Sequence, residues 1–95
     1  MRITDIIWKE RFVEKLSSKH GVSIMEAEEV LLSNPLVRRV ARGSVRGEDV
    51  YSALSQINNG RYLIVFFIKK KQNMILPISA RDMDQSERKY YGKNK

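Results

Sequence analysis

The feature that most constrains the fold is an uninterrupted apolar run of seven residues, YLIVFFI, at positions 62–68. Asn-Asn-Gly precedes the run and three lysines follow it, so turn-forming and charged residues bound it on both sides. A short run rich in β-branched and aromatic residues is typical of a β-strand that is buried on both faces. It is far shorter than the roughly 20 apolar residues that a membrane-spanning helix needs. We therefore predict that it forms the central strand of a sheet, and we expect no membrane partner.

Three other segments have the composition of strands. The NNG sequence at 58–60 favours a tight hairpin, because asparagine and glycine accept left-handed backbone angles, and it would pair residues 48–57 with the central strand. The segment MILPISA at 74–80 predicts a strand that is bulged, or at a sheet edge, at Pro77, because proline cannot donate a ladder hydrogen bond. Residues 36–42, LVRRVAR, predict a short edge strand. The sheet is therefore expected to be antiparallel with three or four strands.

Two helices are expected before these strands. Trp8, Phe12 and Leu16 recur every four residues, which is the apolar stripe of an amphipathic helix. Ser23 and Glu26 then have the spacing of a capping box, in which each side chain hydrogen-bonds the backbone amide of the other residue. The second helix is expected to begin at that point.

A short C-terminal helix is predicted from Asp84 and Glu87, which repeat the capping-box spacing. The order of elements indicates an α+β fold with two N-terminal helices, a three- to four-stranded antiparallel sheet and a short C-terminal helix. At 95 residues the chain has room for one hydrophobic core, so residues 1–95 are expected to form a single domain.

The charge of the chain is concentrated in its second part. The net charge is +7 in all, −1 over the first 35 residues and +8 over residues 36–95. Such an excess favours a polyanionic partner, either nucleic acid or an acidic protein. The chain has no cysteine and one histidine, so we expect neither disulfides nor a metal cofactor. Acidic Asp5 and Glu10 stand where a signal peptide would be basic and then apolar, which favours a cytoplasmic protein.

Three arginines occupy predicted strand or helix ends: Arg61 and Arg81 on strands, and Arg88 on the last helix. A guanidinium group keeps its charge and offers several donors in one plane, which suits a phosphate. The alternative is that each is an ordinary solvated surface arginine. The single histidine, His20, has two interpretations as well. It stabilises the carbonyl end of the first helix together with Lys19, or it transfers protons.

Four segments, in this order, resemble the BrnT family of type II toxin-antitoxin systems: KHGVSIMEAEEV at 19–30, GRYLIVFF at 60–67, ISARDM at 78–83 and SERKYY at 86–91. The resemblance extends from about Trp8 to Tyr91. It implies a single toxin-like domain with a RelE-like fold, which cleaves RNA without a metal ion and thereby inhibits translation. It also implies a cognate antitoxin that forms a hetero-oligomer with the toxin and carries a ribbon-helix-helix DNA-binding region.

Metal-free cleavage of RNA needs a base, an acid and cations that stabilise the phosphorane, and the chain has candidates for each. Arg81 and Arg61 are expected to stabilise the phosphate, with Arg88 and Lys89 binding RNA from the last helix. The remaining catalytic candidates are Lys19 or His20 for proton transfer, Tyr91 as an orienting group or proton donor, and Glu48 as a further base. Glu48 is equally well explained as a strand-edge carboxylate paired with a nearby arginine.

A second function remains open from the sequence. The same basic surface would serve a module that binds nucleic acid or an antitoxin without catalysis, as in a degenerate toxin. Such a module would bind RNA with a strong dependence on salt and would not cut it, because phosphate contacts release counterions.

Overall fold

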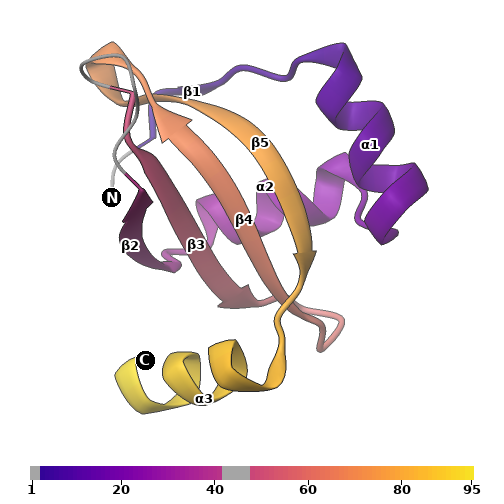
Figure 1. The fold of residues 1–95 in the computed structure, drawn as a ribbon, viewed down its shortest axis with the longest axis vertical. Coiled ribbons are helices and arrows are strands. Elements are labelled where there is room, and N and C mark those ends of the chain that lie inside the picture. The colour runs from indigo at the N-terminus through magenta and orange to yellow at the C-terminus, as the bar shows by residue number, and fades with distance from the viewer. Residues whose placement is uncertain (1–2, 42–47) are drawn as a thin grey trace.

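The computed structural model describes residues 3–41 and 48–95, and within the first helix the side chains of residues 17–19 are not described. Its elements, in chain order, are β1 (Asp5–Ile6), α1 (Glu10–His20), α2 (Ile24–Leu32), β2 (Leu36–Ala41), β3 (Val50–Gln56), β4 (Tyr62–Lys69), a 3-10 turn at Lys71–Asn73, β5 (Met74–Asp82) and α3 (Gln85–Asn94). The strands form one sheet in the order β1-β5-β4-β3-β2 (Figure 1). The predicted α+β class is confirmed.

The sheet has five strands rather than three or four, and it is mixed. Strands β2 to β5 are antiparallel as predicted, with β4 between β3 and β5 and with β2 at an edge. The additional strand, β1, pairs parallel to β5 through Asp5 and Ile6. Two residues are too few for an alternating pattern to identify a strand, so nothing in the sequence predicts β1.

Pro77 has the surroundings that the sequence predicts. The register of β4 against β5 shifts between Phe66, which is opposite Ser79, and Phe67, which is opposite Pro77, so Ile78 forms a bulge. On the other side of β5, the pairing with β1 extends only to Ile75. Pro77 therefore lies at a bulge and beyond the end of the β1 ladder, where the sheet needs no hydrogen bond from a backbone N–H at this position.

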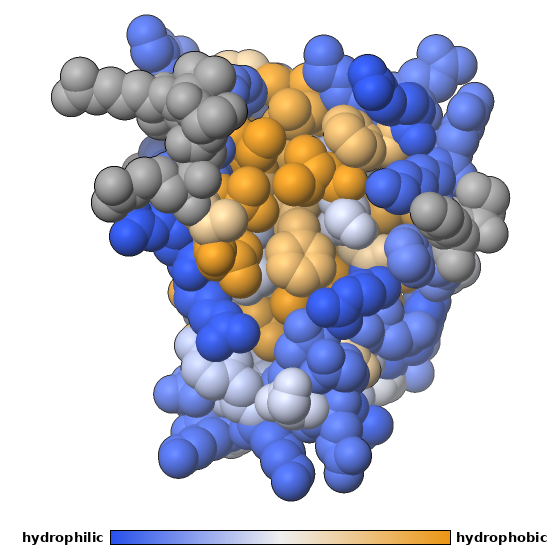
Figure 2. Space-filling view, in the orientation of Figure 1, coloured by the Kyte–Doolittle hydropathy of each residue, from blue (hydrophilic) through white to orange (hydrophobic). Residues whose placement is uncertain are grey.

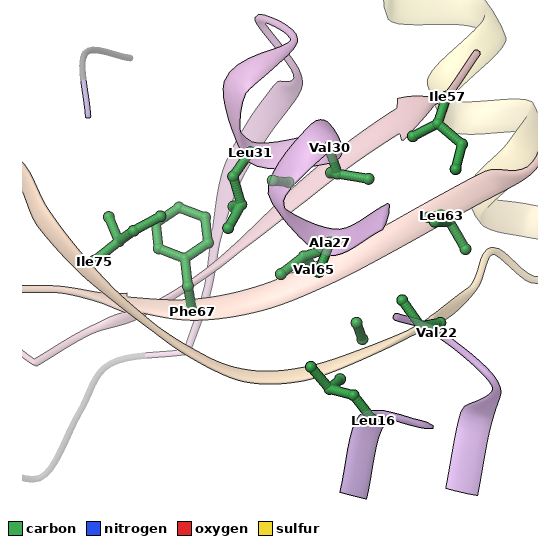
Figure 3. Close-up of a cluster of buried hydrophobic side chains, with 12 residues drawn as sticks. Leu16, Val22, Ala27, Val30, Leu31, Ile57, Leu63, Val65, Phe67 and Ile75 are labelled. Atoms are coloured by element: carbon green, nitrogen blue, oxygen red, sulfur yellow. The ribbon is translucent and has the colours of Figure 1, made fainter. Parts of the chain in front are cut away.

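The main core lies between the sheet and helices α1 and α2, which both cover the same face (Figures 1 and 3). Leu63, Val65 and Phe67 of β4 point toward this core, since alternate residues of a strand share a face. The capping box that begins α2 is formed as predicted. Ser23 Oγ accepts from the Glu26 amide at 3.1 Å, and Glu26 Oε1 accepts from the Ser23 amide at 3.0 Å.

We call the other side of the sheet the open face. Helix α3 crosses this face only at the end of β4 where Tyr62 lies, and there it helps to bury Leu54, Ile64 and Met83 in a smaller cluster. Beyond α3 the apolar side chains of the sheet reach the surface, as Figure 2 shows. Phe66 and Ile68 are accordingly half-buried. The prediction that the central strand is covered on both faces thus holds along only part of its length, because a ten-residue helix is about 15 Å long.

None of the helices in the described ranges is long and apolar enough to cross a membrane.

Candidate nucleic-acid interface

Helix α3 begins directly after β5 because Asp84 caps it. Asp84 Oδ1 accepts from the Glu87 amide at 2.8 Å, and Glu87 Oε1 accepts from the Asp84 amide at the same distance. This is the capping box that the sequence predicts. The helix therefore turns back under the sheet, and Tyr90 and Tyr91 pack against the smaller cluster on the open face (Figure 1).

A second contact fixes α3 to the sheet. Arg81 lies opposite Ile64 in the ladder, and its Nη1 and Nη2 donate to the two carboxylate oxygens of Glu87 at 2.7 and 2.8 Å. Only 12% of the Glu87 side chain is exposed. These hydrogen bonds lower the pKa of Glu87 and raise the pKa of Arg81. The pair clamps β5 to α3, and it largely balances the charge of Arg81.

A groove of about 680 Å³ lies between α3 and the end of the sheet. Tyr62 lines it, and the guanidinium carbon of Arg88 lies 4.1 Å from the centre of the Tyr62 ring. Tyr91 meets the same ring edge-on, with the ring centres 6.2 Å apart. Lys89 also lines the groove. Among the described residues, no carboxylate pairs with Arg88 or Lys89, so the groove has two cations without an ion-pair partner in that part of the chain.

Comparison with known proteins decides the family. The family model described as "Ribonuclease toxin, BrnT, of type II toxin-antitoxin system" matches residues 8–87 of the chain. The chain belongs to the BrnT family. BrnT proteins are ribonuclease toxins of type II toxin-antitoxin systems, so membership of the family implies an antitoxin partner and an RNA substrate.

A solved structure supports the fold. The 1.1 Å crystal structure of the Brucella abortus ribonuclease toxin BrnT is similar with a TM-score of 0.60 and 22% identity, over 85% of this chain and 97% of that one. At this identity the likeness shows a shared fold. No curated protein matches the chain by sequence.

Arg61, one of the two arginines expected from the sequence to stabilise the phosphate, is directed away from the groove. Its guanidinium donates to Glu26 at 3.0 and 3.1 Å, to Asp82 at 3.1 Å and to the backbone oxygen of Gly21 at 3.0 Å. Glu26 and Gly21 belong to the helical layer on the other side of the sheet. The structure thus brings Arg81 and Arg88 to one face and joins Arg61 to the opposite side.

The other candidate site residues are also separated, some at the groove and some away from it. Tyr91 and Lys89 line the groove with Arg88. His20 is the last residue of α1, on the covered side of the sheet. The backbone of Lys19 lies in the same helix turn, whereas its side chain falls outside the described part of the chain. Glu48 precedes β3 at the end of the sheet remote from α3, and it pairs with Lys70 rather than with an arginine.

The sequence did not indicate a functional role for two residues that line the groove, Tyr62 and Gln56. Tyr62 was expected in the core, and it is half-buried with one ring face under Arg88. Gln56 is exposed and lies opposite Tyr62 in the β3–β4 ladder. Alternation from Leu63 places Tyr62 on the open face and is readable in the sequence. The sequence does not predict that Gln56 pairs with Tyr62, because the register of the two strands depends on the geometry of the hairpin.

The clamp predicts a specific dependence of stability on acid. Because the pKa of Glu87 is lowered from its ordinary value of 4.5, its contribution to the free energy of unfolding is complete above that pH and is lost as the pH falls through the lowered pKa. In Glu87→Gln, urea denaturation should therefore show a smaller loss of unfolding free energy between about pH 5 and pH 2 than in the wild type. Part of the acid sensitivity should persist, since the pKa values of Glu26 and Asp84 are lowered too. Equal losses in the two proteins would contradict the clamp.

Proposed function

We propose that this BrnT-family chain is a metal-independent ribonuclease that cleaves RNA in the groove beside α3 and thereby inhibits translation. The observation that carries the proposal is the pair Arg88 and Lys89. Both are cationic, both line the groove, and neither has a carboxylate partner in the part of the chain that is described. A polyanion is the ligand that would compensate them.

The residues on this face suit the chemistry of RNA cleavage. The ribose 2′-hydroxyl attacks the phosphorus and gives its proton to a solvent water, which creates a phosphorane with additional negative charge. The P–O5′ bond then breaks, and the departing 5′-oxygen requires a proton. Arg88 and Lys89 would stabilise that charge without a metal ion, and Tyr91 would donate the proton. A single well-placed donor of this kind is worth about 100- to 1,000-fold in rate.

Arg81, which lies over the ring of Phe66 on the same face of the sheet, is proposed to assist. Its Nη1 donates to Glu87 and to the backbone oxygen of Asp82, and its Nη2 donates once to Glu87. A guanidinium has five N–H donors, so the Nε hydrogen and one Nη2 hydrogen have no partner among the described residues. These donors would bind a phosphate oxygen while Glu87 keeps the guanidinium in place.

The biological setting is proposed to follow from the family. The activity is proposed to act in the cytoplasm, where loss of transcripts would stop protein synthesis. The antitoxin is proposed to carry a ribbon-helix-helix region and to form a hetero-oligomer with the toxin.

The direct test is cleavage by the purified chain. Synthetic RNA should be cut in the presence of excess EDTA, and expression of the chain without its antitoxin should arrest growth and produce new RNA ends. Intact RNA in both experiments would reject the proposal. Cleavage that EDTA abolishes would reject metal independence alone.

A binding module without catalysis is the second candidate, and the ion pairs favour it. Arg61 and Arg81 both form ion pairs with carboxylates. Their positive charge is therefore largely balanced, and less of it is left to stabilise the transition state of phosphate cleavage. Under this alternative, RNA would bind with an affinity that falls steeply as salt rises, and it would remain uncut.

A further inference from the structure

The groove has the size and the walls of a site for one flat organic group. Its volume of about 680 Å³ falls within the range of roughly 300–1,000 Å³ that is typical of small-molecule sites. One face of Tyr62 is covered by the guanidinium of Arg88, and Tyr91 stands edge-on to the same ring. Arg88 is exposed, so the outer face of its guanidinium is a flat surface available for stacking. Guanidinium planes stack nucleobases in RNA-binding proteins.

Gln56 supplies hydrogen-bonding groups at the sheet side of the groove. Its backbone N–H donates to the Tyr91 hydroxyl at 3.3 Å, and its side-chain Nε2 donates to the backbone oxygen of Gly60 at 3.2 Å. The bond to Gly60 holds the side-chain amide of Gln56 in place and uses only one of its hydrogen-bonding groups. The Oε1 acceptor and the second Nε2 hydrogen have no partner in the described ranges. Adjacent donor and acceptor atoms of this kind read the edge of a base.

We propose that the groove is a nucleobase subsite, in which one base of the RNA stacks on Arg88 and is hydrogen-bonded at its edge by the side chain of Gln56. Gln56 then determines which base is preferred next to the cleaved bond. The inference rests on the proposed function, because it takes RNA as the substrate. It adds a recognition role for a residue that has no part in the proposed cleavage chemistry.

The experiment compares the base preference of three proteins: the wild type, Gln56→Glu and Gln72→Glu. A glutamate keeps the shape of glutamine but only accepts hydrogen bonds, so it loses the donor that reads the base. Gln72 is an exposed glutamine in the turn before β5, at the far end of the sheet, and its replacement makes the same charge change. RNA with a randomised segment is cut, and the new ends are sequenced.

We expect the preference of Gln56→Glu between the best and the worst base to change by roughly 10-fold or more, since one bidentate contact gives discrimination of that order. Gln72→Glu should retain the wild-type preference. If Gln56→Glu cuts RNA with the wild-type preference, the subsite is wrong although the nuclease proposal stands.

If the wild type does not cut RNA, measurements of RNA binding distinguish the subsite proposal from the nuclease proposal. The affinities of fluorescent oligo-A, oligo-C and oligo-U are then measured for the same three proteins. A changed order of affinity in Gln56→Glu alone would support the subsite while the nuclease proposal fails. An unchanged order in Gln56→Glu would overturn the subsite by this route as well.

Discussion

Replacing Arg88 with alanine is expected to lower the rate of RNA cleavage by about 100-fold or more, because it removes one of the donors that we propose for stabilising the charge of the phosphorane. The fold should survive the change. Arg88 makes no ion pair with the described residues, and its contact with the ring of Tyr62 is worth roughly 0.5–1 kcal/mol. Initial rates on a labelled oligoribonucleotide and a thermal melt measure the two effects separately.

Arg11→Ala is the matched control for Arg88→Ala. Arg11 is exposed on α1, which covers the other side of the sheet, and its removal subtracts the same charge. A general loss of positive field would slow both variants alike, whereas a site in the groove slows only Arg88→Ala. Equal slowing of both would contradict the proposed site.

Replacing Arg61 with glutamine is expected to lower the free energy of unfolding by about 2 kcal/mol, because the hydrogen bonds from the guanidinium to two carboxylates are lost and bonds to charged groups contribute roughly 1.5–3 kcal/mol. The Glu26 side chain is 21% exposed, and both it and Asp82 lose their contacts to the guanidinium. For a domain of this size the melting temperature should fall by roughly 10 °C. Cleavage measured well below the melting temperature should stay close to the wild-type rate.

Arg39→Gln controls for the loss of an arginine ion pair. Arg39 pairs with Asp49 at 3.4 Å while its side chain is 54% exposed, and exposed pairs contribute roughly 0–1 kcal/mol. Its melting temperature should therefore change little. If Arg61→Gln instead melts like the wild type and no longer cleaves RNA, then Arg61 has the catalytic role predicted from the sequence.

Local patterns were sufficient to predict most of the fold. The two capping boxes, at Ser23 and Asp84, each depend on residues three positions apart, and both form. The bulge beside Pro77 follows from one missing N–H. The strand β1 was missed because its two residues pair with β5 across most of the chain, and the stability of that pairing comes from tertiary structure rather than from local propensity.

The placement of the three candidate arginines follows from the alternation of side chains along the strands, and the sequence anticipated it only in part. Arg81 and Arg88 lie on the open face as the proposal of a shared phosphate site requires. Arg61 is one residue before Tyr62, so its side chain is directed to the other side of the sheet. Parity along β4 is visible in the sequence. The partners that hold Arg61 there, Glu26 and Asp82, come together only through tertiary packing.

The alternation along β4 has a consequence for how such a protein diversifies. Leu63, Val65 and Phe67 belong to the buried interior, whereas Tyr62 borders the groove on the opposite side. Substitutions at neighbouring positions of β4 are therefore expected to have different effects, one set on packing and the other on the proposed recognition of RNA. A combinatorial library that randomises Tyr62 and Gln56 but leaves the odd-numbered positions of β4 unchanged should yield new specificities on an intact scaffold.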